Sequence, residues 1–168
     1  IKYYDAEDDS WSDNELIQIQ EMQSGVEHVI DMLVESGKLE LAKLLLTYDA
    51  DPNTSDNSGK TVLMDAIRGK NPDVVKLLLI NGANPQIQEI NGRNAYHEAA
   101  ESGNIELISL IRTAGGNPLS RDTHGRTPLS LVLNKSEDAI RAVLGNDINL
   151  SDSDGNTPIH IAVLNKVS

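Results

Sequence analysis

Four stretches of the chain repeat one pattern of apolar and polar positions. In residues 73–86 and 106–119 the apolar side chains recur three and four positions apart, which places them on one face of a helix. Each stretch then runs into a group of glycine, asparagine and proline residues, which ends a helix. Residues 40–53 and 138–150 carry a similar pattern. The sequence therefore predicts four amphipathic helices, and the first three follow one another at a constant spacing.

A second pattern with the same spacing lies between these helices. A glycine follows a polar residue at four places; the first two intervals equal the spacing of the helices, and the third is slightly shorter. Glycine tolerates the positive φ of a tight turn, and threonine followed by proline is typical of the start of a helix. We therefore expect a turn and a short helix after each glycine. The turn glycines are Gly59, Gly92, Gly125 and Gly155, and the expected helix caps are Thr61, Asn71, Thr127, Ser136 and Thr157.

The two patterns together resemble the ankyrin repeat. That family's repeat is a turn, the motif T-P-L-H-x-A, a first helix, and a second helix that ends in G-A-D-x-N. The chain has RTPLSLV at 126–132 and NTPIHIAV at 156–163. The resemblance covers residues 23–168, and it implies an all-α solenoid of stacked helix–turn–helix units with protruding β-turns or hairpins. A single helix pair cannot bury its own apolar face, whereas stacked pairs can.

On this pattern residues 25–168 hold four repeats and the first half of a fifth. The first repeat is degenerate, because GVEHVIDML stands where the turn and its motif belong. The fourth repeat is shorter than the others between Leu133 and Ala139, so we expect a shortened first helix or a tighter turn between its helices. The chain stops before a second helix of the fifth repeat, and we expect it to be a fragment of a longer protein.

The segment 1–24 precedes the repeats. Residues 1–11, IKYYDAEDDSW, are acidic and hold three aromatic side chains. They are either a solvated tail, or a short segment that recognises a partner or docks on the solenoid itself. Residues 12–24 open with the capping-box pattern of Ser12 and Glu15, followed by apolar side chains at helical spacing. We expect a helix there that covers the open end of the first repeat.

Composition narrows the classes of function. Of the net charge of −12, residues 1–22 carry −6, since seven acidic residues face Lys2 alone. The chain has no cluster of lysine and arginine residues for phosphate groups, so we expect no nucleic-acid partner. No apolar run approaches the ~18 residues of a membrane span. Without cysteine there is no disulfide, thiolate metal site or cysteine nucleophile. We expect a monomer, cytoplasmic or nuclear by default.

The histidines are the strongest candidates for catalytic residues, but their positions in the repeat indicate a structural role. His97 and His160 stand at the fourth position of the TPLH-like motif, where the resemblance implies a ring that ties neighbouring repeats together through backbone groups. Met64 and Ser130 hold the same position elsewhere, which a catalytic role would not allow. The stretch DSDG at 152–155 fails the spacing of a calcium loop. We therefore predict no enzyme activity, no cofactor and no metal site.

The surface is the remaining candidate for function. The resemblance implies that turn tips and first helices line a concave face, which is the usual partner site of the family. Ile90, at a turn tip, is expected to anchor a partner. Asp65, Glu98 and Glu101 are expected to form a negative strip that attracts a protein with a basic surface. The predicted protein-binding residues are Lys60, Asp65, Arg68, Ile90, Arg93, Glu98, Glu101 and Arg126.

Two functions fit these expectations. The first is a protein–protein interaction module, acting as a scaffold, adaptor or inhibitor that binds a partner on the concave face. The alternative is a regulatory ankyrin arm of a larger enzyme whose catalytic domain lies outside this chain. The full open reading frame would discriminate between them.

Overall fold

The computed structural model describes residues 39–48, 50–146, 149, 151, 152 and 154–164. The expected acidic tail (1–11), the expected capping helix (12–24) and the first half of the first repeat lie outside the described residues. The described helices are α3 (Leu39–Thr47), α4 (Val62–Arg68), α5 (Pro72–Ile80), α6 (Ala95–Ser102), α7 (Ile105–Thr113), α8 (Pro128–Val132), α9 (Glu137–Leu144) and α10 (Pro158–Leu164).

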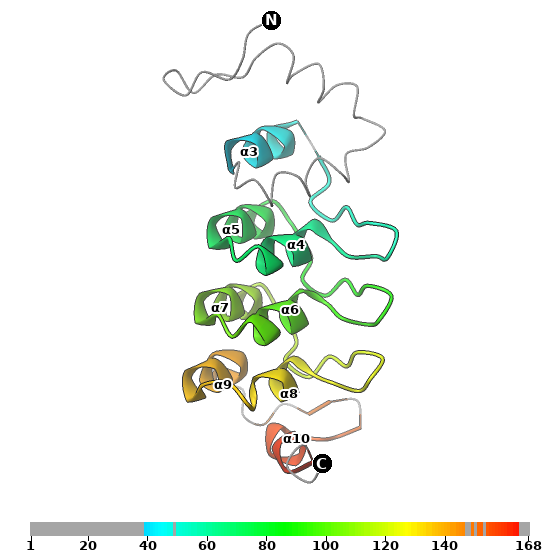
Figure 1. The fold of residues 1–168 in the computed structure, drawn as a ribbon, viewed down its shortest axis with the longest axis vertical. Coiled ribbons are helices and arrows are strands. Elements are labelled where there is room, and N and C mark those ends of the chain that lie inside the picture. Colours follow the sequence, from blue (N-terminus) through cyan, green and yellow to red (C-terminus); the bar gives the residue numbers. More distant parts are fainter. Residues whose placement is uncertain (1–38, 49, 147–148, 150, 153, 165–168) are drawn as a thin grey trace, which may run out of the picture.

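The helices form two rows, as Figure 1 shows. The first helices α4, α6 and α8 stack in one row, with α10 below α8, and the second helices α3, α5, α7 and α9 stack in the other. An extended turn projects beyond the first row in each repeat. An isolated β-bridge joins Ser55 to Thr61. The described residues contain no extended β-sheet. The expected all-α solenoid is confirmed.

The two rows give the stack two long surfaces. We use "concave face" for the surface formed by the turn tips and the first helices, following the pattern of the resembling family. We use "second-helix face" for the opposite surface, formed by α3, α5, α7 and α9.

Short polar side chains fix where each helix begins. Thr61 accepts a hydrogen bond from the backbone N–H of Met64, and Thr127 accepts one from the N–H of Ser130. Such a bond satisfies one of the N–H groups that a helix start leaves without a partner. The expected caps of these helices are confirmed. The second helices α5, α7 and α9 are capped in the same way by Asn71, Asn104 and Ser136.

The core is a continuous column of aliphatic side chains between the two rows. Its largest members, each less than 2% exposed, include Leu63, Ile67, Leu78, Leu107, Ile111 and Leu129. Tyr96 adds an aromatic ring. Its hydroxyl donates a hydrogen bond of 2.8 Å to the carbonyl oxygen of Val143, which joins α6 to α9, and burial raises the pKa of Tyr96 far above its usual value. A chain without phenylalanine thus builds its core from thin layers.

The fourth repeat accommodates its shorter sequence in its first helix. α8 has five residues, against seven in α4 and eight in α6. α8 still packs on α6, and α9 still packs on α7. The expected shortening is therefore confirmed, and it leaves the stack continuous.

The loop between α4 and α5 contains a strained residue. Lys70 has φ +54°, and Gly103, at the equivalent position of the next repeat, has φ +66°. A side chain in this left-handed region costs about 1 kcal/mol relative to glycine. We predict that Lys70→Gly raises the melting temperature by about 2–4 °C, the shift expected from about 1 kcal/mol in a chain of this size. Gly103→Lys is the matched reverse change and should lower the melting temperature. A lower melting temperature for Lys70→Gly would contradict the assignment of backbone strain to Lys70.

Candidate protein-binding surface

An acidic side chain holds each turn tip together. The carboxylate of Asp56, three positions before Gly59, accepts hydrogen bonds from the backbone N–H groups of Ser58 and Lys60 at 2.8 and 2.9 Å. The same two bonds recur in the other three turns. The three other acids are Glu89, Asp122 and Asp152. Our reading of the sequence missed these residues, although an acid three positions before every turn glycine was a visible signal.

Neighbouring tips are tied to each other through the backbone. The N–H of Ile90 donates to the carbonyl oxygen of Ser58 at 2.8 Å, and the N–H of Thr123 donates to that of Asn91 at 2.9 Å. The expected positive φ of the turn glycines is confirmed, with values between +73° and +79° at all four. The first three tips therefore form a fixed ladder, because each is closed by its carboxylate and is bonded to its neighbour.

The tip carboxylates make the stability of the fold depend on pH. A hydrogen bond from the Ser58 hydroxyl is the largest cause that lowers the pKa of Asp56. Burial alone would raise the pKa of Asp122 and Asp152, but N–H bonds and a nearby arginine outweigh it, which lowers the pKa of Asp122 and brings that of Asp152 to about 2. These carboxylates stabilise the fold above their unfolded pKa of about 3.9 and lose that contribution as the pH falls through their lowered folded pKa values.

We predict that the melting temperature falls as the pH is lowered from about 4 to about 2, the interval between the unfolded pKa of an aspartate and the folded pKa of Asp152. Thermal unfolding followed by circular dichroism measures it. Asp122→Asn keeps an oxygen that can accept the two N–H bonds but does not titrate, so this variant should show a shallower fall. An equal fall in both proteins would rule out the contribution of Asp122.

The charged residues on the first helices and tips are paired with one another. Lys60 lies 2.6 Å from Asp65 within one repeat. Arg68, at the end of α4, reaches Glu98 on α6 at 2.9 Å, which links two repeats. A separate tip residue, Arg126, pairs with the tip carboxylate of Asp122.

Glu98 is the centre of this network. Arg93 lies 3.0 Å from Glu98 and also pairs with Glu101, so one carboxylate bridges two arginines. Only 7% of Glu98 is exposed. Burial alone would raise the pKa of Glu98, but the hydrogen bonds and positive charges of Arg68 and Arg93 lower it below its ordinary value. The group is therefore ionised and fixed in position.

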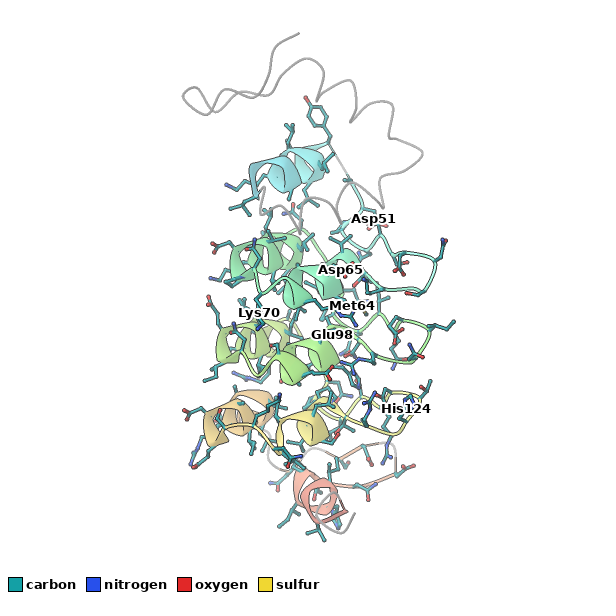
Figure 2. All side chains as sticks on the ribbon, in the orientation of Figure 1. Asp51, Met64, Asp65, Lys70, Glu98 and His124 are labelled. Carbon is teal, nitrogen blue, oxygen red and sulfur yellow. The ribbon has the colours of Figure 1, made fainter. Side chains whose placement is uncertain are left out.

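The expected negative strip of Asp65, Glu98 and Glu101 needs correction. Figure 2 shows Asp65 one repeat above Glu98 on the first helices, as the spacing predicted. However, each of the three acids is paired with Lys60, Arg68 or Arg93, so the surface presents a balanced ion-pair network instead of unpaired negative charge. One pair follows from stacking, because Arg68 at the end of α4 lies beside Glu98 on α6. The other pairs form within a single repeat.

Ile90 stands out from these paired side chains. It is 75% exposed at the tip between Ser58 and Thr123, although its own backbone is fixed in the ladder. A branched apolar side chain held rigidly in water contributes nothing to its own repeat. It is the clearest apolar contact point that the concave face offers.

Of the two motif histidines, His97 has the predicted bond to a neighbouring repeat, whereas the bonds of His160 are to Thr157 in its own repeat. His97 is fully buried; its Nδ1 accepts from the N–H of Asn94, and its Nε2 bonds to the carbonyl oxygen of Arg126 in the next repeat, both at 3.2 Å. Burial lowers the pKa of His97, which keeps the ring neutral. The exposed His160 accepts from the N–H of Thr157 in the same way.

Serine can stand at this position because it makes the same local bond. The hydroxyl of Ser130 accepts from the N–H of Thr127 at 2.9 Å. Only the longer histidine ring of His97 also reaches the following repeat, so the position caps a helix and, with histidine, ties two repeats together.

Other kinds of site find no support in the part of the chain that the structure describes. Within it, no group of three or more histidine, aspartate or glutamate side chains could hold a metal ion. None of its helices is long and apolar enough to cross a membrane.

The fold and this surface define a helical repeat protein whose exposed face is a fixed array of tips and ion pairs. The chain belongs to the ankyrin repeat family: the family model described as ankyrin repeats (3 copies) matches residues 30–122 and again residues 96–167. Ankyrin repeats are generally protein–protein interaction modules, and domains built from them are typically non-catalytic. No curated protein matches the chain.

Proposed function

We propose that the chain is a non-catalytic interaction module that binds another protein on its concave face, as a monomer, across the tips and first helices of the central repeats. The observation that carries the proposal is Ile90, 75% exposed on a tip whose backbone is bonded to the preceding repeat. Anchors of this kind, at the centre of an interface, supply much of the binding free energy.

The ion-pair network beside Ile90 supports the same surface. Arg68 and Glu101 are each exposed over 55% of their side chains, while the buried Glu98 fixes the arginines that contact it. Charged groups already held in place lose little conformational entropy on binding, which favours affinity. We infer a partner with complementary charges of both signs near the network. The overall charge of −12 speeds association with a basic protein.

Two exposed isoleucines on opposite faces give a matched test. Affinity capture followed by mass spectrometry identifies a partner, and calorimetry then measures its Kd for each variant. Ile90→Ala should weaken binding by about 5–30-fold, the equivalent of about 1–2 kcal/mol. Ile80→Ala, on the second-helix face, should leave the Kd unchanged. Loss of binding with Ile80→Ala and full binding with Ile90→Ala would reject the concave face.

A further inference from the structure

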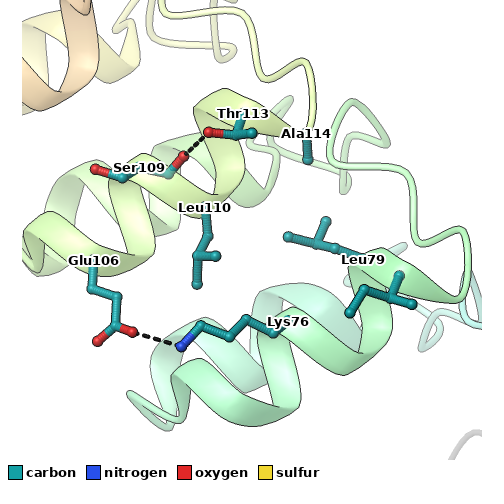
Figure 3. Close-up of a pocket in the computed structure, with 8 residues that line it drawn as sticks. Lys76, Leu79, Glu106, Ser109, Leu110, Thr113 and Ala114 are labelled. Atoms are coloured by element: carbon teal, nitrogen blue, oxygen red, sulfur yellow. Dashed lines mark hydrogen bonds and ion pairs between the residues drawn. The ribbon is translucent and has the colours of Figure 1, made fainter.

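The second-helix face has an apolar groove that no residue of the described repeats fills. It lies between α5 and α7 and has a volume of about 460 Å³. Figure 3 shows Leu79 and Leu110 pointing into the space between the two helices, with the ion pair of Lys76 and Glu106, 2.8 Å, at one end. The lining is almost entirely apolar.

Two strongly exposed apolar side chains lie at the ends of second helices, one of them in the lining of the groove. Ile80 borders it and is 84% exposed, and Tyr48, just beyond the end of α3, is 76% exposed. Both lie where second helices end, on neighbouring levels of the stack. Exposed apolar side chains beside an apolar groove mark a place where another segment can bind.

Residues 1–11 of the same chain have the composition that fits this groove. They contain Tyr3, Tyr4 and Trp11, which are three of the five aromatic residues in the chain. Aromatic side chains bury large areas and favour apolar pockets. Between them stand four carboxylates, at positions 5 and 7–9.

Two lysines on the second-helix face provide positive charge near the groove. Lys43 on α3 and Lys76 on α5 are one repeat period apart and thus occupy equivalent positions in consecutive second helices. Lys43 is exposed, and Lys76 keeps 42% of its side chain in solvent while it pairs with Asp73 and Glu106. Lys76 lines the groove, so the carboxylates of a segment bound there would have this cation beside them, with Lys43 one helix further along the stack.

The chain is long enough for this contact. Residues 12–38 separate Trp11 from the start of α3. Half of that length in extended form spans about 40 Å. Packed helices lie about 8–10 Å apart, so the groove between α5 and α7 is about 15 Å along the stack from α3.

We propose that residues 1–11 dock in the groove between α5 and α7, with their aromatic side chains against Leu79, Ile80 and Leu110 and their carboxylates toward Lys43 and Lys76. The contact forms within one chain. It covers the second-helix face and leaves the concave face free, so it does not rest on the partner site proposed above.

Trp11 is the only tryptophan of the chain, so its fluorescence reports this contact directly. In the full chain we expect an emission maximum blue-shifted from that of a free tryptophan amide, together with several-fold weaker quenching by acrylamide. Ile80→Asp should shift the emission to the red and restore quenching. Ile90→Asp changes an equally exposed isoleucine on the other face and should leave both readings unchanged.

Circular dichroism first establishes that both variants keep the helical fold. Emission of a fully solvated tryptophan in the wild-type chain would overturn the proposal. So would a blue shift that Ile80→Asp leaves in place, since Trp11 would then be buried elsewhere. A shift that grows with protein concentration would assign the groove to the segment of a second chain and would equally overturn docking within one chain.

Discussion

Gly92→Val is expected to lower the free energy of unfolding by about 2 kcal/mol or more, and the melting temperature by about 4–8 °C. Two causes add. Gly92 has φ +73°, which valine resists, and a Cβ at this position would stand 3.1 Å from the backbone nitrogen of Thr123 and 3.2 Å from Cα of Asp122. Both neighbours are backbone atoms of the next tip, so the ladder must open to admit the side chain.

Gly125→Val separates the two causes. Gly125 has the same φ of +73° in the next turn, but the nearest atom to its Cβ position is the end of the Arg121 side chain, 3.9 Å away. This variant should lose only the backbone contribution, about 1 kcal/mol. Thermal or urea unfolding of the two variants measures the difference. Equal losses would mean that the contact between tips contributes nothing to stability.

Glu98→Lys is expected to destabilise the fold by about 3 kcal/mol or more, the usual effect of breaking a buried ion pair. The change removes the carboxylate that lies 2.9 Å from Arg68 and 3.0 Å from Arg93, and places a third cation between them. This position is therefore unsuitable for testing a binding surface, because lost binding could follow from lost folding. Urea unfolding measures the effect.

Glu101→Lys is the matched control for this change. Glu101 belongs to the same network and pairs with Arg93, but more than half of its side chain is exposed. Exposed ion pairs contribute about 0–1 kcal/mol, so the variant should unfold near the wild-type midpoint. If Glu98→Lys proved as stable as Glu101→Lys, the buried carboxylate would not hold the two repeats together.

The sequence carries enough information for the solenoid because its signals repeat. The turn glycines recur with the same spacing as the apolar faces, and Thr61 and Thr127 cap their helices as expected. The structural role of the tip acids could have been predicted in the same way, since an acid three positions before every turn glycine is a periodic signal. The positive φ of Lys70 could also have been predicted, because a glycine, Gly103, occupies the equivalent position one period later.

The link between repeats in the ion-pair network could not be derived in this way. Arg68 and Glu98 belong to different repeats, and their contact depends on the register in which α4 and α6 stack. The pairs within one repeat could have been predicted, because Lys60 precedes Asp65 by the same five positions that separate Arg93 from Glu98. The groove between α5 and α7 could not, since it depends on side-chain sizes across two repeats.

The most direct test of the concave face is an NMR titration, for which a chain of 18.3 kDa is well suited. Amide chemical shifts of the labelled protein are recorded as the captured partner is added. We predict that the largest changes fall on the tips, at residues 57–58, 90–91 and 123–124, and on the side of the first helices around Arg68 and Glu101. Changes confined to α5, α7 and α9, with the tips unaffected, would contradict the proposed binding surface.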